Sequence, residues 1–128
     1  MGNGTSIGRV RGLGSAKTGS HHFWYQRLTA ASNLLLMLWF VFSLAMLPAW
    51  DYDTVFAWLS SAWAAVPMLL LVSSVFYHAK IGLQTVIEDY QHDETRVVLM
   101  ILLQLVYGGG WLFAAFSILR IAFTGTPA

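Results

Sequence analysis

Three long stretches of the sequence are almost free of charged residues, and they restrict the chain to a membrane fold. They run over residues 28–47, 67–87 and 97–119. A helix that crosses a hydrocarbon core of ~30 Å needs about 20 apolar residues, because each residue adds ~1.5 Å. Each stretch meets that length. We therefore predict an all-α integral membrane protein with three transmembrane helices.

The composition agrees with this fold class and excludes others. Apolar residues make up 57% of the chain and charged residues 10%, whereas soluble domains are about half apolar and about a quarter charged. The apolar content excludes disorder, and the absence of cysteine excludes a disulfide scaffold or a cysteine metal site. A net charge of +1 gives no reason to expect nucleic-acid binding.

The segments outside the spans suggest the domain organisation. Residues 1–20 are rich in glycine, basic and free of acids, so we predict a flexible arm ahead of a membrane domain over 21–128. Apolar residues in 54–65 have a spacing that suits a short helix in the membrane interface. Pro67 suits the first turn of the second span. The stretch 88–96 is predicted to be a polar loop.

Basic residues flank the first span unevenly. Four basic residues lie on its N-terminal side: Arg9, Arg11, Lys17 and Arg27. The loop after the span has no basic residue. The positive-inside rule places the N-terminus in the cytoplasm and the C-terminus outside. His21 and the 88–96 stretch then share the cytoplasmic face with Arg27. We expect a bacterial inner (cytoplasmic) membrane and favour it over the mitochondrial inner membrane, because the arm lacks the amphipathic pattern of a presequence.

His78 lies near the middle of the second span, where a polar side chain needs a reason. Three roles are open: a hydrogen bond to a neighbouring helix, a proton relay, or axial ligation of a haem iron. Ser74 and Gly82, one turn on either side, are small enough for a flat macrocycle or another helix to approach. The other histidines lie outside the spans: His21, His22 and His92. A haem held by two histidines would therefore need a ligand from a partner chain.

Polar residues at the same membrane face also have two possible roles. Asp89 and Tyr90 could belong to the interfacial belt, or they could bind a quinone, with the hydroxyl on a carbonyl and the carboxylate as a proton source. His21 and Arg27 could anchor the helix, or they could hold haem propionates and order the quinone pocket. Lys80 lies about 12 Å below the loop by helix rise and could meet a carboxylate or a lipid headgroup of a partner.

Three motifs resemble the D-type small cytochrome b subunit, the hydrophobic membrane anchor of succinate dehydrogenase (respiratory complex II). They are Gly19-Ser20-His21 followed by Arg27-Leu28-Thr29-Ala30, then Phe76-Tyr77-His78-Ala79 with Gly82, then Glu88-Asp89-Tyr90. The similarity covers nearly the whole chain. Its most specific part is His-Ala-x-x-Gly with Asp-Tyr eleven and twelve residues after the histidine.

The resemblance implies a subunit of a four-subunit succinate:ubiquinone oxidoreductase, active in the tricarboxylic acid cycle and aerobic electron transport. Its partners would be a C-type cytochrome b anchor subunit, an iron–sulfur subunit, a flavoprotein subunit and membrane lipids. It implies that His78 is an axial ligand of the iron of haem b, shared with the partner anchor. Tyr90 and Asp89 would bind ubiquinone, and His21 and Arg27 would lie near the haem propionates and the quinone pocket.

Two alternatives to this assignment stay open. One is the anchor of a fumarate reductase, which runs the same parts in reverse. The other is a haem-free structural anchor, in which His78 only packs between helices. In every case the chain itself would not oxidise succinate, because its sequence contains no flavin, nucleotide or iron–sulfur motif.

Overall fold

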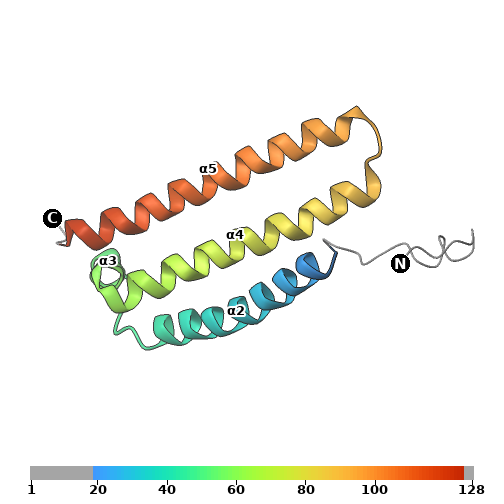
Figure 1. Cartoon of the computed structure of the whole chain (residues 1–128). Helices are drawn as coiled ribbons and strands as arrows, with labels where there is room; N and C mark the ends of the chain where they lie inside the picture. Colours follow the sequence, from blue (N-terminus) through green and yellow to red (C-terminus); the bar gives the residue numbers. More distant parts are fainter. Residues whose placement is uncertain (1–18, 126–128) are drawn as a thin grey trace, which may run out of the picture.

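The chain is entirely helical over the part that the computed structural model describes, residues 19–125. Its elements are α2 (Gly19–Ala45), α3 (Tyr52–Ser60), α4 (Ala62–Tyr90) and α5 (Glu94–Thr124). The three long helices lie side by side with α4 in the middle, and the short α3 sits at the end of α4 and α5 away from the 91–93 turn (Figure 1). The described residues contain no strand, so the predicted all-α fold is confirmed.

Each long helix contains a segment long and apolar enough to cross a membrane: Phe23–Ala45, Ala62–Tyr90 and Glu94–Thr124. The three predicted spans are thereby confirmed. α4 has 29 residues and α5 has 31, which gives lengths of ~44 and ~46 Å. Both exceed a hydrocarbon core of ~30 Å, so their ends extend beyond the apolar spans.

The predicted loop over 88–96 is wrong. α4 continues to Tyr90 and α5 begins at Glu94, so only 91–93 connects the two helices. Polar residues can prolong a helix outside the hydrocarbon core, because the helix already satisfies its own backbone hydrogen bonds. The predicted arm over 1–20 is also two residues too long, since Gly19 begins α2; residues 1–18 lie outside the described part.

Pro67 is not in the first turn of its helix, contrary to the sequence prediction. α4 begins at Ala62, so Pro67 is an interior residue. A proline there leaves the carbonyl of Trp63, four residues earlier, without its helical N–H partner. The Trp63 side chain is 90% exposed, which places this interruption at an accessible end of the helix.

The short interfacial helix predicted over 54–65 corresponds to α3.

Asp51 begins α3 as its N-cap residue. Its carboxylate accepts hydrogen bonds from the Thr54 hydroxyl at 2.6 Å and from the Thr54 backbone N–H at 3.4 Å. The hydrogen bond from the hydroxyl holds the pKa of Asp51 below its ordinary value. Trp58 of α3 stacks on Trp39 of α2, with ring centroids 6.0 Å apart. The ring contact joins the side chains of α3 and α2, whereas the backbone of α3 packs against α4 and α5.

The bundle has a thin core. Among the described residues, six apolar side chains are buried: Ala64, Ala65, Leu71, Ile81, Leu103 and Ile118. Four of them lie on α4, as expected for the central helix. Most large apolar side chains of α2 and α5 are exposed. An apolar surface of this extent needs lipid or further helices around it, in agreement with the expected place in a larger helix bundle.

Of the three adjacent glycines of α5, Gly110 is the one that lies against α4. A Cβ atom added there would lie 2.9 Å from Cε1 of Phe76, whereas one at Gly108 or Gly109 would meet nothing within 4 Å. The Phe76 ring is packed edge-on against Tyr107, with centroids 6.1 Å apart, and has little room to move aside. The close crossing that the three glycines suggest is therefore located at Gly110.

We predict that Gly110→Ala destabilises the packing of α5 on α4. Overpacking costs about 1–3 kcal/mol, more than the ~1 kcal/mol that alanine gains in helix propensity. Gly109→Ala is the matched control, because it gains the propensity without the contact. Unfolding in mixed micelles of rising SDS content, followed by tryptophan fluorescence, compares the two. Equal stability of both variants would contradict the close approach at Gly110.

The charge asymmetry across α2 predicts that the 91–93 turn is cytoplasmic and that the 46–51 connection is outside. The chain has no cysteine, so His92→Cys and Ala49→Cys each create a single labelling site. A membrane-impermeant thiol reagent added to cells with a permeabilised outer membrane should label Ala49→Cys at once. It should label His92→Cys only after lysis, and the reverse order would refute this orientation.

Candidate functional site

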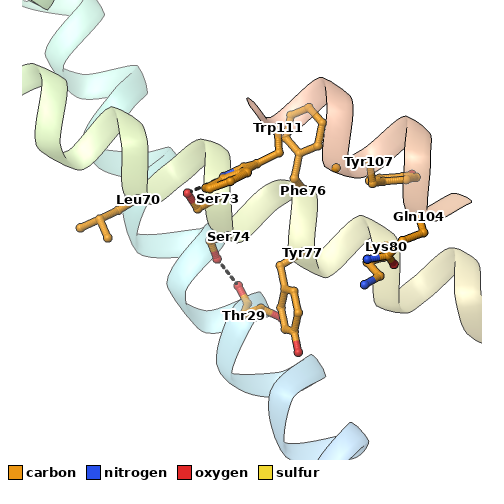
Figure 2. A pocket seen from close by; sticks show the side chains of 11 residues that line it. Thr29, Leu70, Ser73, Ser74, Phe76, Tyr77, Lys80, Gln104, Tyr107 and Trp111 are labelled. Carbon is orange, nitrogen blue, oxygen red and sulfur yellow. Dashed lines mark hydrogen bonds between the residues drawn. The ribbon is translucent and has the colours of Figure 1, made fainter. Parts of the chain in front are cut away.

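The contact between α2 and α4 is built around Thr29 and His78. Nδ1 of His78 lies 3.0 Å from Oγ1 of Thr29. One turn earlier on α4, the Ser74 hydroxyl donates a hydrogen bond of 3.4 Å to the backbone carbonyl of Thr29, which Figure 2 shows as a dashed line. Ser74 and His78 are four residues apart and so share a helix face. α4 therefore contacts Thr29 at two atoms.

The second ring nitrogen of His78 is free of this contact. Within residues 19–125, Nε2 makes no hydrogen bond, although the side chain is half-buried. Gly82 lies one turn further along α4, and a Cβ atom there would meet only Nε2 of Gln26, at an ordinary 3.9 Å. Packing of α2 on α4 therefore does not require glycine at position 82.

A polar stripe on α2 faces α4. It consists of Gln26, Thr29 and Asn33, at the spacing that places residues on one helix face. Oε1 of Gln26 and Oδ1 of Asn33 are buried and have no hydrogen-bond partner among the described residues. This stripe was not predicted from the sequence, because none of its side chains is ionisable. Uncharged polar side chains three and four residues apart in an apolar span were the available signal.

A cavity of about 530 Å³ lies between α4 and α5, and Thr29 of α2 also lines it. Figure 2 shows Lys80 and Gln104 together at one end and Trp111 above Ser73 toward the other. The Trp111 indole N–H donates to the Ser73 hydroxyl at 2.9 Å. Lys80 forms no ion pair within the described part of the chain. Lys80 lines this cavity and His78 does not, so the two side chains lie on different sides of α4.

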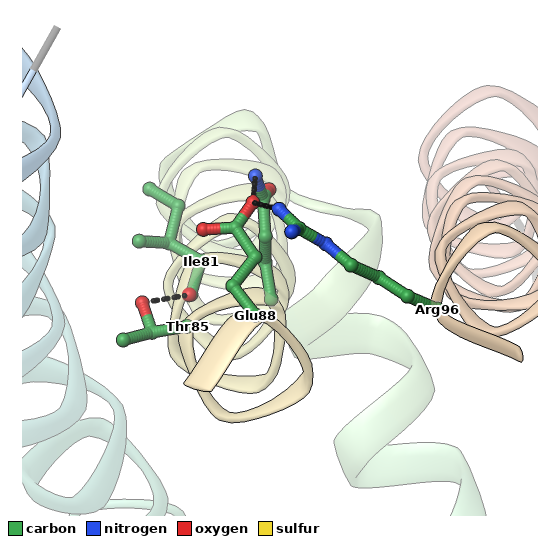
Figure 3. Close-up of polar contacts among 5 residues, drawn as sticks. Ile81, Thr85, Glu88 and Arg96 are labelled. Atoms are coloured by element: carbon green, nitrogen blue, oxygen red, sulfur yellow. Dashed lines mark hydrogen bonds and ion pairs between the residues drawn. The ribbon is translucent and has the colours of Figure 1, made fainter. Parts of the chain in front are cut away.

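Asp89 and Tyr90 end α4 beside the short turn to α5. Both side chains are exposed, that of Tyr90 to 79%. Next to them, Arg96 of α5 reaches Glu88 of α4, with Nη2 and Oε1 3.8 Å apart (Figure 3). The Gln84 amide donates to the same carboxylate oxygen at 2.9 Å. An exposed pair of this kind adds little stability, but it links the two helices next to Asp89 and Tyr90.

His21 lies at the same end of the bundle as Tyr90. α2 and α4 run in opposite directions (Figure 1). Gln26 of α2 lies opposite Gly82 of α4. His21 is five residues before Gln26, and Tyr90 is eight residues after Gly82, so both lie toward the 91–93 turn. His21 and Tyr90, which were predicted to lie at the same membrane face, thus lie at the same end of the bundle.

Arg27 is close to this end but is separate from His78. Its guanidinium carbon lies 4.4 Å from the centroid of the Phe23 ring, a cation–π contact on the exposed side of α2. No ion pair or hydrogen bond within residues 19–125 joins Arg27 or His21 to His78, Asp89 or Tyr90. Both side chains are exposed, and they are accessible to groups outside this chain.

A family model and individual relatives of known name identify the same protein family. Residues 1–116 match the sequence model of the succinate dehydrogenase/fumarate reductase transmembrane subunit. A succinate dehydrogenase hydrophobic membrane anchor subunit of Rickettsia bellii is 37% identical over 84 residues, 66% of this chain and 67% of that one. The corresponding subunit of Rickettsia conorii is 34% identical over 101 residues, 77% and 80% of the two chains.

A third relative agrees with these two. The succinate dehydrogenase membrane anchor subunit of Reclinomonas americana is 31% identical over 94 residues, 70% of this chain and 78% of that one. No solved structure gives a significant match. The family match covers all three long helices at least in part, and the relatives carry the same membrane-anchor description. The chain belongs to the succinate dehydrogenase/fumarate reductase transmembrane subunit family.

Proposed function

We propose that this chain is the membrane anchor subunit of a succinate:ubiquinone oxidoreductase, in which it ligates haem b through His78 and helps to form the ubiquinone-reduction site. The observation that carries the haem assignment is the environment of His78. Its Nδ1 is held by Thr29, while Nε2 has no partner within residues 19–125. The names of the relatives support the anchor role.

The residues around His78 suit a haem. Imidazole nitrogen is the common axial ligand of haem iron, and a helix-bundle interior can enclose the macrocycle. Gly82, one turn from the ring, has no side chain that an approaching macrocycle would meet. No group of three His, Asp or Glu side chains gathers among the described residues, but an axial position needs only one histidine from this chain. When bound, haem b would supply a one-electron relay.

A second histidine ligand for a haem held by His78 would come from a partner subunit. The other histidines within residues 19–125 lie at the start of α2 and in the 91–93 turn, outside the candidate membrane spans: His21, His22 and His92. The exposed apolar faces of α2 and α5 offer surface for a second anchor subunit. His21 and Arg27 are exposed at the end of α2, where cationic groups could bind haem propionates in that assembly.

Tyr90 and Asp89 form the proposed quinone site. Reduction of ubiquinone to ubiquinol takes two electrons and two protons. The electrons would come from the iron–sulfur subunit, after a flavoprotein subunit has oxidised succinate. The Tyr90 hydroxyl donates a hydrogen bond to a quinone carbonyl oxygen, and Asp89 takes up protons from the cytoplasmic water and passes them on. Exposure of both side chains at the bundle end suits a site completed by the partner subunits.

Fumarate reduction is the second candidate, because the matched family description names both enzymes. The relatives are succinate dehydrogenase subunits, and this favours succinate oxidation. Two of them are bacterial proteins, in line with the proposed place in a bacterial inner membrane. Fumarate reduction by menaquinol that clearly exceeds succinate–ubiquinone activity in the purified complex would reverse this choice.

We predict that His78→Ala removes or alters the haem b signal of the purified complex, because the iron loses one axial ligand. The measurement is a reduced-minus-oxidised absorption spectrum of the chain with the subunits that copurify. His92→Ala is the matched control and should leave the spectrum unchanged. A wild-type spectrum in a fully assembled His78→Ala complex would contradict the haem assignment.

We predict that Tyr90→Phe lowers succinate–ubiquinone turnover by about 100-fold, since it removes a hydrogen-bond donor that acts in the proton-coupled step. Electron transfer from succinate to a water-soluble acceptor that bypasses the membrane subunits should stay at the wild-type rate. Tyr52→Phe, another exposed tyrosine but at the opposite end of the bundle, is the control. Unchanged quinone activity in Tyr90→Phe would refute the assignment of Tyr90.

A further inference from the structure

We infer that Thr29 is a positioning residue for the haem ligand: its hydroxyl holds His78 in the tautomer with the proton on Nδ1 and so presents the lone pair of Nε2 to the iron. This inference rests on the proposed function of His78 as a haem ligand. It assigns a role to a residue of α2 that touches neither the iron nor the quinone.

The hydroxyl group of Thr29 carries a single proton. Oγ1 of Thr29 lies 2.7 Å from the carbonyl oxygen of Tyr25, 3.1 Å from that of Gln26 and 3.0 Å from Nδ1 of His78. A carbonyl oxygen can only accept a hydrogen bond, whereas a hydroxyl can donate one and accept others. At 2.7 Å, two oxygens without a proton between them would repel. The proton of Thr29 therefore points to Tyr25.

This assignment leaves the Thr29 oxygen as an acceptor toward His78. Nδ1 must then carry the ring proton, and the neutral imidazole keeps its lone pair on Nε2. Within residues 19–125, Nε2 makes no hydrogen bond that would compete for that lone pair. A metal-ligating histidine commonly donates its other N–H to an oxygen in this way, which fixes the ring and raises its basicity.

The position of Thr29 is itself well determined. Its backbone carbonyl accepts the hydrogen bond from Ser74, one turn before His78 on α4. Its hydroxyl is tied to the preceding turn of α2, an arrangement that restricts its rotamer. Thr29 and His78 are both half-buried, so water competes weakly for their contact. The same two helices thus fix both the helix register and the ring orientation.

The decisive test replaces Thr29 in the assembled complex and measures properties of the haem other than turnover. Thr29→Val keeps the shape but removes the acceptor, so the ligand becomes less basic. We expect a higher haem midpoint potential, an altered electron paramagnetic resonance spectrum of the ferric haem, and haem retention weaker by about 10-fold or more. Thr29→Ser retains the hydroxyl and should restore all three to wild-type values.

Ser32→Ala is the matched control. The Ser32 hydroxyl donates to the carbonyl of Leu28 at 2.9 Å, so its removal deletes a similar intrahelical bond one turn away without affecting His78. This variant should match the wild type. If Thr29→Val does not assemble, Thr29→Ala, which introduces no bulk, takes its place with the same expected shifts.

The outcomes separate the two levels of inference. Wild-type potential and resonance spectrum in an assembled Thr29→Val complex, with the haem b signal lost or altered in His78→Ala, would overturn the role of Thr29 alone. A wild-type haem b spectrum in an assembled His78→Ala complex would overturn the ligand assignment, and the inference from Thr29 would end with it. A shift in Thr29→Val that Thr29→Ser does not restore would likewise contradict a role for the hydroxyl.

Discussion

The hydrogen bond between Thr29 and His78 connects the fold of this chain to its proposed chemistry. In a bundle with so few buried side chains, apolar packing alone positions the helices weakly against one another. Polar contacts between α2 and α4 position the two helices more specifically, because few other hydrogen-bond partners compete with such a contact inside a membrane. The contact sets the register of the two helices, and the same contact leaves one nitrogen of His78 available to a ligand.

The rest of the site follows from the direction of the helices that this contact joins. Since α2 and α4 are antiparallel, the start of α2 and the end of α4 lie together, so His21 and Tyr90 share one end of the bundle. The short 91–93 turn brings the start of α5 to the same end, where Arg96 pairs with Glu88. In the proposed function, this geometry offers one haem ligand within the membrane span and polar groups at the bundle end, and a partner subunit would complete both sites.

Much of this arrangement could be predicted from the sequence. Three apolar stretches of spanning length define the helices, and one histidine among apolar residues identifies the candidate ligand, because the membrane penalises any polar group without a purpose. The helix ends could not be predicted in the same way. Hydropathy reports where the hydrocarbon core ends, whereas the helices continue through 88–90 and begin again at Glu94 in polar surroundings. The contact of Thr29 with His78 could not be predicted either, because it depends on which helix lies opposite, information that a single sequence does not contain.

A structure of the native complex, determined by electron cryo-microscopy with its copurified subunits and haem, is the most direct test of the central claim. We predict that the iron is bonded to Nε2 of His78, with Oγ1 of Thr29 at hydrogen-bond distance from Nδ1 and a ligand from the partner anchor on the opposite side. A complete complex in which Nε2 of His78 packs against a neighbouring helix, with no haem bonded to it, would contradict the account.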